Sequence, residues 1–349
     1  MNRIHPREPQ RFPLAHLPTP LVRLPRLAEV VGLRTVLMKR DDLTGLELTG
    51  NKVRKLEYLL ADALAQGCDT LVTLGAVQSN HCRATAAVGA KLGMRVRLLL
   101  RSSEPGPALV GNLLLDRMFG AEVSLHDPEE FNHRRQQLVQ ATLAAERAAG
   151  RKPCFFGIGG STPLGCWGYI RCMAELAEQL DPRLEYELFL PLSSCGTLTG
   201  VLLGRELFHL ENVGVTAVLV SDNREHFQRE LPLLFRQTAE QFDLPVSRRE
   251  PEVTLLDGFI GPGYGLPTEA AVAALRLLAR REAILLDPVY TAKAMAGMLD
   301  RLSRQPRDRQ AIPVFLHTGG VFGMLAWPQL LAAGLAGENS GGSNFRSVL

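Results

Sequence analysis

The sequence lacks any run of about 18 consecutive apolar residues, which argues against a membrane-spanning helix. Its first segment, MNRIHPREPQRF, has no continuous apolar stretch, so we expect no secretory signal there. An excess of one charge is also missing, because 39 basic residues face 36 acidic ones and leave a formal net charge of +3. Since the basic residues are scattered, we expect neither a nucleic acid nor a membrane as partner.

Paired CxxC motifs are absent as well. The six cysteines are Cys68, Cys82, Cys154, Cys166, Cys172 and Cys195. A chain of 349 residues, 46% of them hydrophobic, can form a large core without cross-links. We therefore expect six free thiols in a reducing, cytoplasmic compartment. A zinc site would need clustered ligands, and the sequence shows no such cluster, so no metal is expected.

Lysine is scarce, and one of the six lysines has an unusual position. Lys52 follows Thr49, Gly50 and Asn51, and apolar residues recur at helical spacing from Val53 onward, so Lys52 is predicted to start a helix. The positive end of the helix dipole disfavours a cation there, which favours the neutral amine of a Schiff-base nucleophile. Taken by itself, the segment fits a solvated lysine at a helix start equally well.

Strand-like and helix-like segments alternate along the chain. In the first series, strands are predicted at 71–75, 95–101, 121–126 and 154–160, and helices at 79–93, 107–120 and 129–150. A second series has strands at 186–193, 213–220 and 313–320, and a helix at 268–281. This order predicts two α/β domains with parallel sheets, and ligands at the carboxyl ends of the strands. The tail 337–349 is rich in Gly, Ser and Asn and is predicted to be disordered.

Several motifs together resemble the family of D-cysteine desulfhydrases and 1-aminocyclopropane-1-carboxylate (ACC) deaminases. The two long motifs are GNKVRKLEYL (50–59) and GAVQSNHCRATA (75–86). Shorter ones follow in order: GGSTPLG (159–165), GPGYGLPTE (261–269), LDPVYTAKAMAG (286–297) and HTGG (317–320). The similarity runs from LPTPLVRLPRL (17–27) to about Trp327.

This resemblance implies a pyridoxal-phosphate (PLP) enzyme of fold type II, similar to the tryptophan synthase beta chain. Such an enzyme has two open, twisted parallel-sheet domains with the cofactor between them. The larger domain is expected to comprise residues 1–53 and 166–336, and the smaller one residues 54–165. Relatives are usually homodimers, so we expect a homodimer.

The resemblance also implies roles for residues at both helix starts. Lys52 is expected to form the Schiff base with PLP and then to act as the base at the substrate carbon, next to the cofactor-binding Asn51. The stretch Gln78, Ser79, Asn80 and His81 is expected to hold the substrate carboxylate, with Ser79 nearest the chemistry and Asn80 on the cofactor ring oxygen. An ordinary helix cap is the alternative for all four residues.

The loop SSCGTLTG (193–200) directly follows a predicted strand, and small residues let its backbone wrap an anion. By resemblance it binds the cofactor phosphate through Ser194, Cys195, Gly196 and Thr197, while a plain turn and cap is the alternative. Cys195 stands where relatives more often have glycine or alanine. Ser161 and Thr162 are expected near the substrate.

Tyr264 and Tyr290 are two of only five tyrosines, and both face the substrate in relatives. A phenol there can donate or accept a proton. Thr318 is expected to bind the pyridine nitrogen, which favours β-elimination over deeper carbanion chemistry. ACC deaminases have Leu at that position and Glu in place of Thr291, so both threonines indicate desulfhydrase-like chemistry.

We therefore expect α,β-elimination on a small amino acid, most simply D-cysteine converted to pyruvate, sulfide and ammonia. The alternatives are another β-substituted amino acid, such as L-cysteate or chloroalanine, or ACC. A non-catalytic PLP-binding protein is an alternative of another class. A nucleotide-binding oxidoreductase is disfavoured because no GxGxxG motif opens a helix after the first strand.

Overall fold

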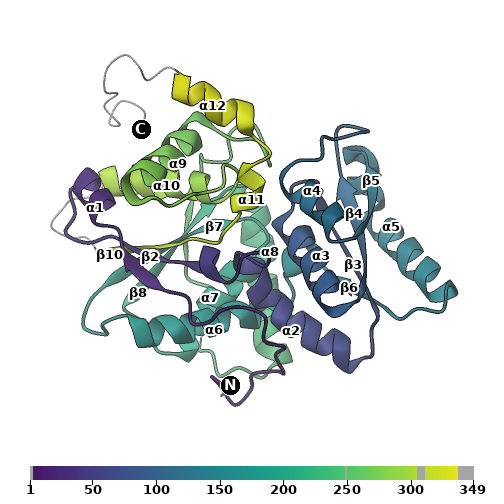
Figure 1. The fold of residues 1–349 in the computed structure, drawn as a ribbon. Helices are drawn as coiled ribbons and strands as arrows, with labels where there is room; N and C mark the ends of the chain where they lie inside the picture. The colour runs from purple at the N-terminus through teal and green to yellow at the C-terminus, as the bar shows by residue number, and fades with distance from the viewer. Residues whose placement is uncertain (1–2, 248–249, 305–310, 337–349) are drawn as a thin grey trace.

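The computed structural model describes residues 3–247, 250–304 and 311–336, and it contains two sheets flanked by helices (Figure 1). The tail 337–349, predicted to be disordered, lies outside the described residues. Within the described ranges, no helix combines the length and apolar character that crossing a bilayer requires. The fold is therefore the α/β arrangement expected from the alternating pattern, with two mostly parallel sheets.

The larger sheet has six strands in the order β1-β2-β10-β7-β8-β9. Their bounds are β1 Leu21–Arg23, β2 Leu37–Lys39, β7 Tyr186–Leu192, β8 Val213–Leu219, β9 Thr254–Leu256 and β10 Ile312–Leu316. All neighbours are parallel except β1, which is antiparallel to β2 at the sheet edge. The central strands are almost continuously apolar because helices cover both of their faces.

Two groups of helices cover this sheet (Figure 1). One group packs in a core with β7 and β8 and comprises α6 Pro163–Gln179, α7 Gly196–Leu207 and α8 Arg224–Gln241. The other comprises α1 Pro25–Val31, α9 Glu269–Glu282 and α10 Thr291–Arg304. Two shorter helices, α11 Val321–Met324 and α12 Pro328–Ala336, follow β10.

The smaller sheet has four parallel strands in the order β5-β4-β3-β6. Their bounds are β3 Thr70–Ala76, β4 Arg95–Arg101, β5 Glu122–His126 and β6 Pro153–Phe156. Its helices are α3 Asn80–Leu92, α4 Gly111–Met118 and α5 Pro128–Ala148. Apolar residues of β3 and β4 pack against α5 on one face and against α3 on the other. The strands of this sheet all come from residues 70–156, while the domain boundaries themselves stay a prediction.

Three predicted elements are clearly shorter than expected, and one of them, the predicted strand 313–320, ends at Leu316. The predicted helix 107–120 begins only at Gly111, because Val110 is extended and Gly111 has a left-handed φ of 55°. The predicted strand 154–160 ends at Phe156 and continues into a short 3-10 helix, Ile158–Gly160. Gly159 and Gly160 have φ values of 63° and 62°, a conformation incompatible with a strand.

Helix α2, Asn51–Ala65, connects the two sheets and packs against both α6 and α3. Its first turn is fixed by a buried ion network. Arg54 donates to Asp41 and to Glu175, with N···O distances of 2.7–2.9 Å, and Lys39 reaches the same Glu175 carboxylate at 2.7 Å. Asp41 begins the 3-10 helix Asp41–Leu43. The carboxylates of Asp41 and Glu175 therefore hold the first turn of α2, which contains Lys52.

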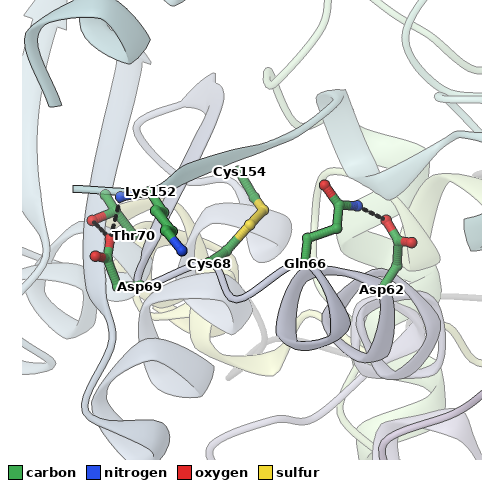
Figure 2. The surroundings of a disulfide bond; sticks show 7 residues. All are labelled: Asp62, Gln66, Cys68, Asp69, Thr70, Lys152 and Cys154. Carbon is green, nitrogen blue, oxygen red and sulfur yellow. Dashed lines mark hydrogen bonds between the residues drawn. A yellow bond between two sulfur atoms is a disulfide. The ribbon is translucent and has the colours of Figure 1, made fainter. Parts of the chain in front are cut away.

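A disulfide between Cys68 and Cys154 contradicts the expectation of six free thiols (Figure 2). The two cysteines are 86 residues apart, but Cys68 precedes β3, and Cys154 lies in β6 directly opposite Leu71 of β3. Their Cα atoms are 6.0 Å apart, a normal separation for a disulfide. The spacing of the two cysteines along the sequence could not predict this disulfide, because they come together only through the pairing of β3 with β6. The other four cysteines are free and buried.

Candidate active site

A cavity of about 960 Å³ lies where the carboxyl ends of the two sheets face each other. Its wall includes residues at the ends of β3, β4, β7 and β10 and others on α5 and α8. Small-molecule sites typically enclose about 300–1,000 Å³, so this cavity has room for a cofactor together with a small substrate.

Lys52 borders the cavity in the first turn of α2. Burial lowers the pKa of its amine well below the usual 10.5, and the nearby Lys55 ammonium lowers it further. The amine is therefore held in its neutral, nucleophilic form, as the sequence position suggested.

The loop before Lys52 is in direct backbone contact with the loop after β10. The Asn51 amide donates to the Thr318 carbonyl at 3.0 Å. A Cβ at Gly50 would lie 2.8 Å from that carbonyl oxygen, and one at Gly319 would lie 2.5 Å from the Gly50 Cα. Both glycines have positive φ, so the close approach requires glycine on each side.

Ser79 caps α3 at the carboxyl end of β3, and its hydroxyl accepts a hydrogen bond from the Cys82 amide at 3.2 Å. Asn80 follows, and its side-chain oxygen accepts from Asn112 at 2.9 Å. His81 is buried, and both its ring nitrogens lack a partner among the described residues. Burial, followed by Lys52 and Lys55, lowers the pKa of His81 well below 6.5, so its ring is neutral.

The loop before α7 forms a small cradle of donors. Cys195 caps the helix with a φ of 53°, and the Gly196 amide donates to the Ser161 hydroxyl at 3.2 Å. A Cβ at Gly196 would lie 2.8 Å from that hydroxyl and 3.0 Å from the Lys55 amine. Ser161 also donates to Ser194 at 3.0 Å. The start of this 12-residue helix therefore has the donors and the concave shape that suit an anion.

Lys55 was not predicted to have a role, although it follows Lys52 by one helical turn. Its amine donates to the Gly159 carbonyl at 3.2 Å and to the Ser161 hydroxyl at 3.3 Å. Burial lowers its pKa to about 8. The spacing of three residues puts both lysines on one face of α2, a signal that was available in the sequence.

The hydroxyls of Tyr264 and Tyr290 lie 2.5 Å apart at the cavity wall. Burial raises the pKa of both phenols, and for Tyr264 the hydrogen bond with Tyr290 and the charge of Arg101 oppose that rise. Asp287, also missed by the sequence analysis, accepts from the Tyr290 amide at 2.7 Å and from the Thr291 hydroxyl at 2.7 Å. It therefore fixes the turn that carries Tyr290.

Most predicted site residues line the one cavity. They are Asn51, Lys52, Ser79, Asn80, His81, Ser161, Ser194, Cys195, Thr197, Tyr264, Tyr290 and Thr318. Gly196 contributes through its position in the cradle. Three others are not among the lining residues: Gln78, Thr162 and Thr291.

These three residues hold neighbouring backbone instead. Gln78 bonds the Val110 carbonyl and the Asn112 amide, Thr162 caps α6, and the Thr291 hydroxyl bonds Asp287. Each is one or two residues from a lining residue, so its position in the motif could not show whether its side chain lines the cavity.

Comparisons with known proteins agree with this geometry. A model of the family described as "Pyridoxal-phosphate dependent enzyme" matches residues 13–319. Proteins named D-cysteine desulfhydrase from Yersinia enterocolitica and Serratia proteamaculans are 41% and 42% identical, with 92% of this chain and 97% of each relative covered. A solved structure described as an ACC deaminase homologue has a TM-score of 0.84 and 34% identity, covering 94% of this chain and 99% of that one.

The residues around the cavity fit PLP. Lys52 offers a neutral amine, the start of α7 with Lys55 offers a site for a phosphate, and the Thr318 hydroxyl has no protein partner in the described part of the chain. The family match, the relatives and this donor set agree, and the chain belongs to the pyridoxal-phosphate-dependent enzyme family.

Proposed function

We propose that this chain is a D-cysteine desulfhydrase, a carbon–sulfur lyase that converts D-cysteine to pyruvate, sulfide and ammonia. The observation that carries the proposal is the identity of 41–42% with proteins of that name over 92% of the chain. The arrangement of the cavity supports it, since one lysine and a tyrosine pair line the same space.

Lys52 is the base in this proposal. A neutral amine can accept the proton from the substrate Cα, and burial favours the neutral form of Lys52 by lowering its pKa well below the usual 10.5. Bound PLP supplies the electron sink for the electron pair left at Cα. Lys55 and the amides at the start of α7 hold the phosphate, and so position the cofactor relative to Lys52.

The start of α3 holds the substrate carboxylate. Ser79, Asn80 and His81 line the cavity at the start of α3, and a helix N-terminus favours an anion. His81 is neutral with two free ring nitrogens, so it can donate one hydrogen bond there. Ser79 keeps its hydroxyl hydrogen available, because in its capping bond the oxygen is the acceptor.

Tyr264 and Tyr290 provide the proton for the leaving group. A high pKa keeps both phenols protonated near neutral pH, so either can act as an acid but neither as a ready base. When the Cβ–S bond breaks, its electron pair leaves with sulfur, and a tyrosine proton converts the departing sulfur to hydrogen sulfide.

Thr318 separates this activity from ACC deamination. A neutral hydroxyl at the pyridine nitrogen leaves that nitrogen largely unprotonated, which gives a weaker sink than cyclopropane ring opening needs. Thr291, the other threonine in this argument, does not line the cavity and bonds Asp287, so the proposal rests on Thr318.

The proposal also covers the oligomeric state, the domain boundaries and the cellular location of the protein. We infer a homodimer and the division into residues 1–53 plus 166–336 and 54–165 from the family resemblance. We also infer a cytoplasmic location, a prediction that rests on free thiols. The Cys68–Cys154 disulfide counts against that argument, since structural disulfides are rare in the cytosol.

The deciding experiment measures sulfide and pyruvate release from the PLP-loaded protein given D-cysteine, with L-cysteine, chloroalanine and ACC in parallel. Fast release from D-cysteine but not L-cysteine supports the proposal. A PLP-loaded protein that changes its visible spectrum with every amino acid but yields no product would instead be a non-catalytic PLP-binding protein.

A Lys52→Ala variant tests the base and cofactor assignment. It should lose both turnover and the visible absorbance that PLP shows when bonded to a lysine amine. Lys91→Ala, on the exposed end of α3, is the matched control and should keep both. Retained lysine-bound absorbance in Lys52→Ala would remove Lys52 from the proposal.

A further inference from the structure

Strand β4 presents three arginines on one face, and only one of them has no acidic partner among the residues that the structure describes. Arg95, Arg97 and Arg101 are spaced by even numbers and therefore point to the same side of the strand. Arg97 pairs with Glu146 at 2.6 Å, and Arg95 pairs with Glu122. For Arg101, no described carboxylate lies within 4.0 Å, and its guanidinium has no side-chain hydrogen bond.

Arg101 lines the cavity at the carboxyl end of β4. It lies opposite Ala76, the last residue of β3, so it shares a sheet edge with the loop that leads to Ser79. Its guanidinium carbon lies 5.4 Å from the centre of the Tyr264 ring. A cation with no acidic partner therefore adjoins both the proposed carboxylate site and the proposed acid.

The stacking on Tyr264 also orients the guanidinium. A cation over an aromatic face is held in place, while the N–H donors at the edge of the guanidinium plane stay available. Those donors match the oxygens of a carboxylate or sulfonate in a bidentate arrangement. The cavity's own acids, Asp222, Glu230 and Asp287, form no ion pair with it.

We propose that Arg101 determines specificity by binding an acidic group on Cβ of the substrate. The site then accepts amino acids with a carboxylate or sulfonate on Cβ in addition to D-cysteine. The inference rests on the proposed function for the position of the substrate. With a sulfonate on Cβ, Lys52 takes the α-proton, the Cα–Cβ double bond forms, and the Cβ–S electron pair leaves as sulfite. Hydrolysis then gives pyruvate and ammonia, and no oxidant is needed.

Aspartate and asparagine provide the matched test, because they are nearly isosteric and differ in one charge. Their dissociation constants are measured, for both enantiomers, from the visible spectral change of the PLP-loaded protein, a readout that needs no turnover. The wild type should bind aspartate about tenfold more tightly than asparagine, the gain expected for a charge-assisted hydrogen-bonded pair. Arg101→Gln should remove this preference, and Arg101→Lys should restore part of it.

Arg135→Gln is the control for general electrostatics. Arg135 lines the same cavity from the exposed surface of α5, so its loss changes the net charge of the cavity by the same amount. The preference for aspartate over asparagine should persist in this variant. Raising the salt concentration should reduce that preference only slightly. Equal loss in Arg135→Gln and Arg101→Gln would overturn the assignment to Arg101.

Turnover completes the test and separates this inference from the proposed function. Sulfite release from cysteate should fall at least tenfold in Arg101→Gln, while pyruvate formation from chloroalanine should change less than twofold. Sulfide release from D-cysteine together with equal affinities for aspartate and asparagine would overturn the inference alone. Preferential aspartate binding without any sulfide release would support Arg101 and overturn the proposed function.

Discussion

The hydroxyl oxygens of Tyr264 and Tyr290 lie 2.5 Å apart, although the residues are 26 positions apart in the chain. At that distance one phenol donates to the other, so a proton given to the substrate by one can be drawn from its neighbour. The two residues come from different motifs, GPGYGLP and LDPVYT, and only the fold makes them a unit.

We expect Tyr264→Phe and Tyr290→Phe each to lower kcat for pyruvate formation by about 10²-fold or more, the usual effect of losing a general acid. The double variant should be little worse than either single one, because residues that act as a unit are not additive. Tyr186→Phe is the control, since that hydroxyl lies away from the cavity lining and accepts from the Asp181 amide. Fully multiplicative losses would show that the tyrosines act separately.

Lys55→Met should weaken PLP binding at least tenfold, because Lys55 lies 3.3 Å from Ser161 at the proposed phosphate site and its loss removes a cation there. At saturating PLP, kcat should fall by a smaller factor, because Lys55 also helps to lower the pKa of Lys52. Equilibrium dialysis against PLP measures the affinity, and Lys91→Met serves as the control. A large fall in kcat with unchanged affinity would contradict a phosphate role.

Cys68→Ser should lower the free energy of unfolding by about 2–4 kcal/mol in the absence of reductant, because the disulfide closes a loop of 86 residues. Cys154→Ser and the double variant should lose the same amount. Urea unfolding measures the effect, and dithiothreitol should reduce the stability of the wild type but not that of the variants. A reductant effect that persists in Cys68→Ser would assign the stabilisation elsewhere.

Asp116 should make stability depend on pH. Both of its carboxylate oxygens are buried without a partner among the described residues, and burial raises its pKa from 3.8 to about 8. The folded chain thus binds this proton more tightly than the unfolded chain. That contribution to stability is complete below pH 3.8 and is lost as pH rises through about 8, at most about 1.4 kcal/mol per pH unit.

Asp116→Asn carries no charge at any of these pH values, so it removes that dependence. Relative to wild type, the variant should gain stability between pH 6 and pH 8, as measured by urea unfolding at both. A difference in unfolding free energy that stays constant over this range would show that Asp116 is ionised at pH 6.

The sequence predicted the parts of the site that local pattern determines. Lys52 at a helix start, Ser79 at a helix cap and Cys195 in a small-residue loop each follow a strand or open a helix, and chain order is enough to place them. Strand β4 was also predicted with its observed bounds, because its apolar residues fall between polar neighbours.

The remaining features depend on contacts between distant segments. Arg101 looks like any charged strand end until the fold stacks it on Tyr264, and Cys68 meets Cys154 only because β3 and β6 are neighbours. Gln78 shows the opposite error: its motif neighbour Ser79 lines the cavity, but its own side-chain amide bonds Val110 and Asn112 instead. Side-chain direction within a turn is not encoded in motif position.

The backbone contact between Gly50 and Gly319 has an evolutionary consequence. Backbone atoms alone hold Lys52 in position next to the loop of Thr318. The position of Lys52 is therefore independent of the side chains on β4, α5 and α8. Those walls can accumulate substitutions, Arg101 among them, while the reactive amine stays in place. The substrate specificity of this protein can therefore change through single substitutions in the cavity wall. The two glycines cannot be replaced in the same way, because a side chain at either would break the contact.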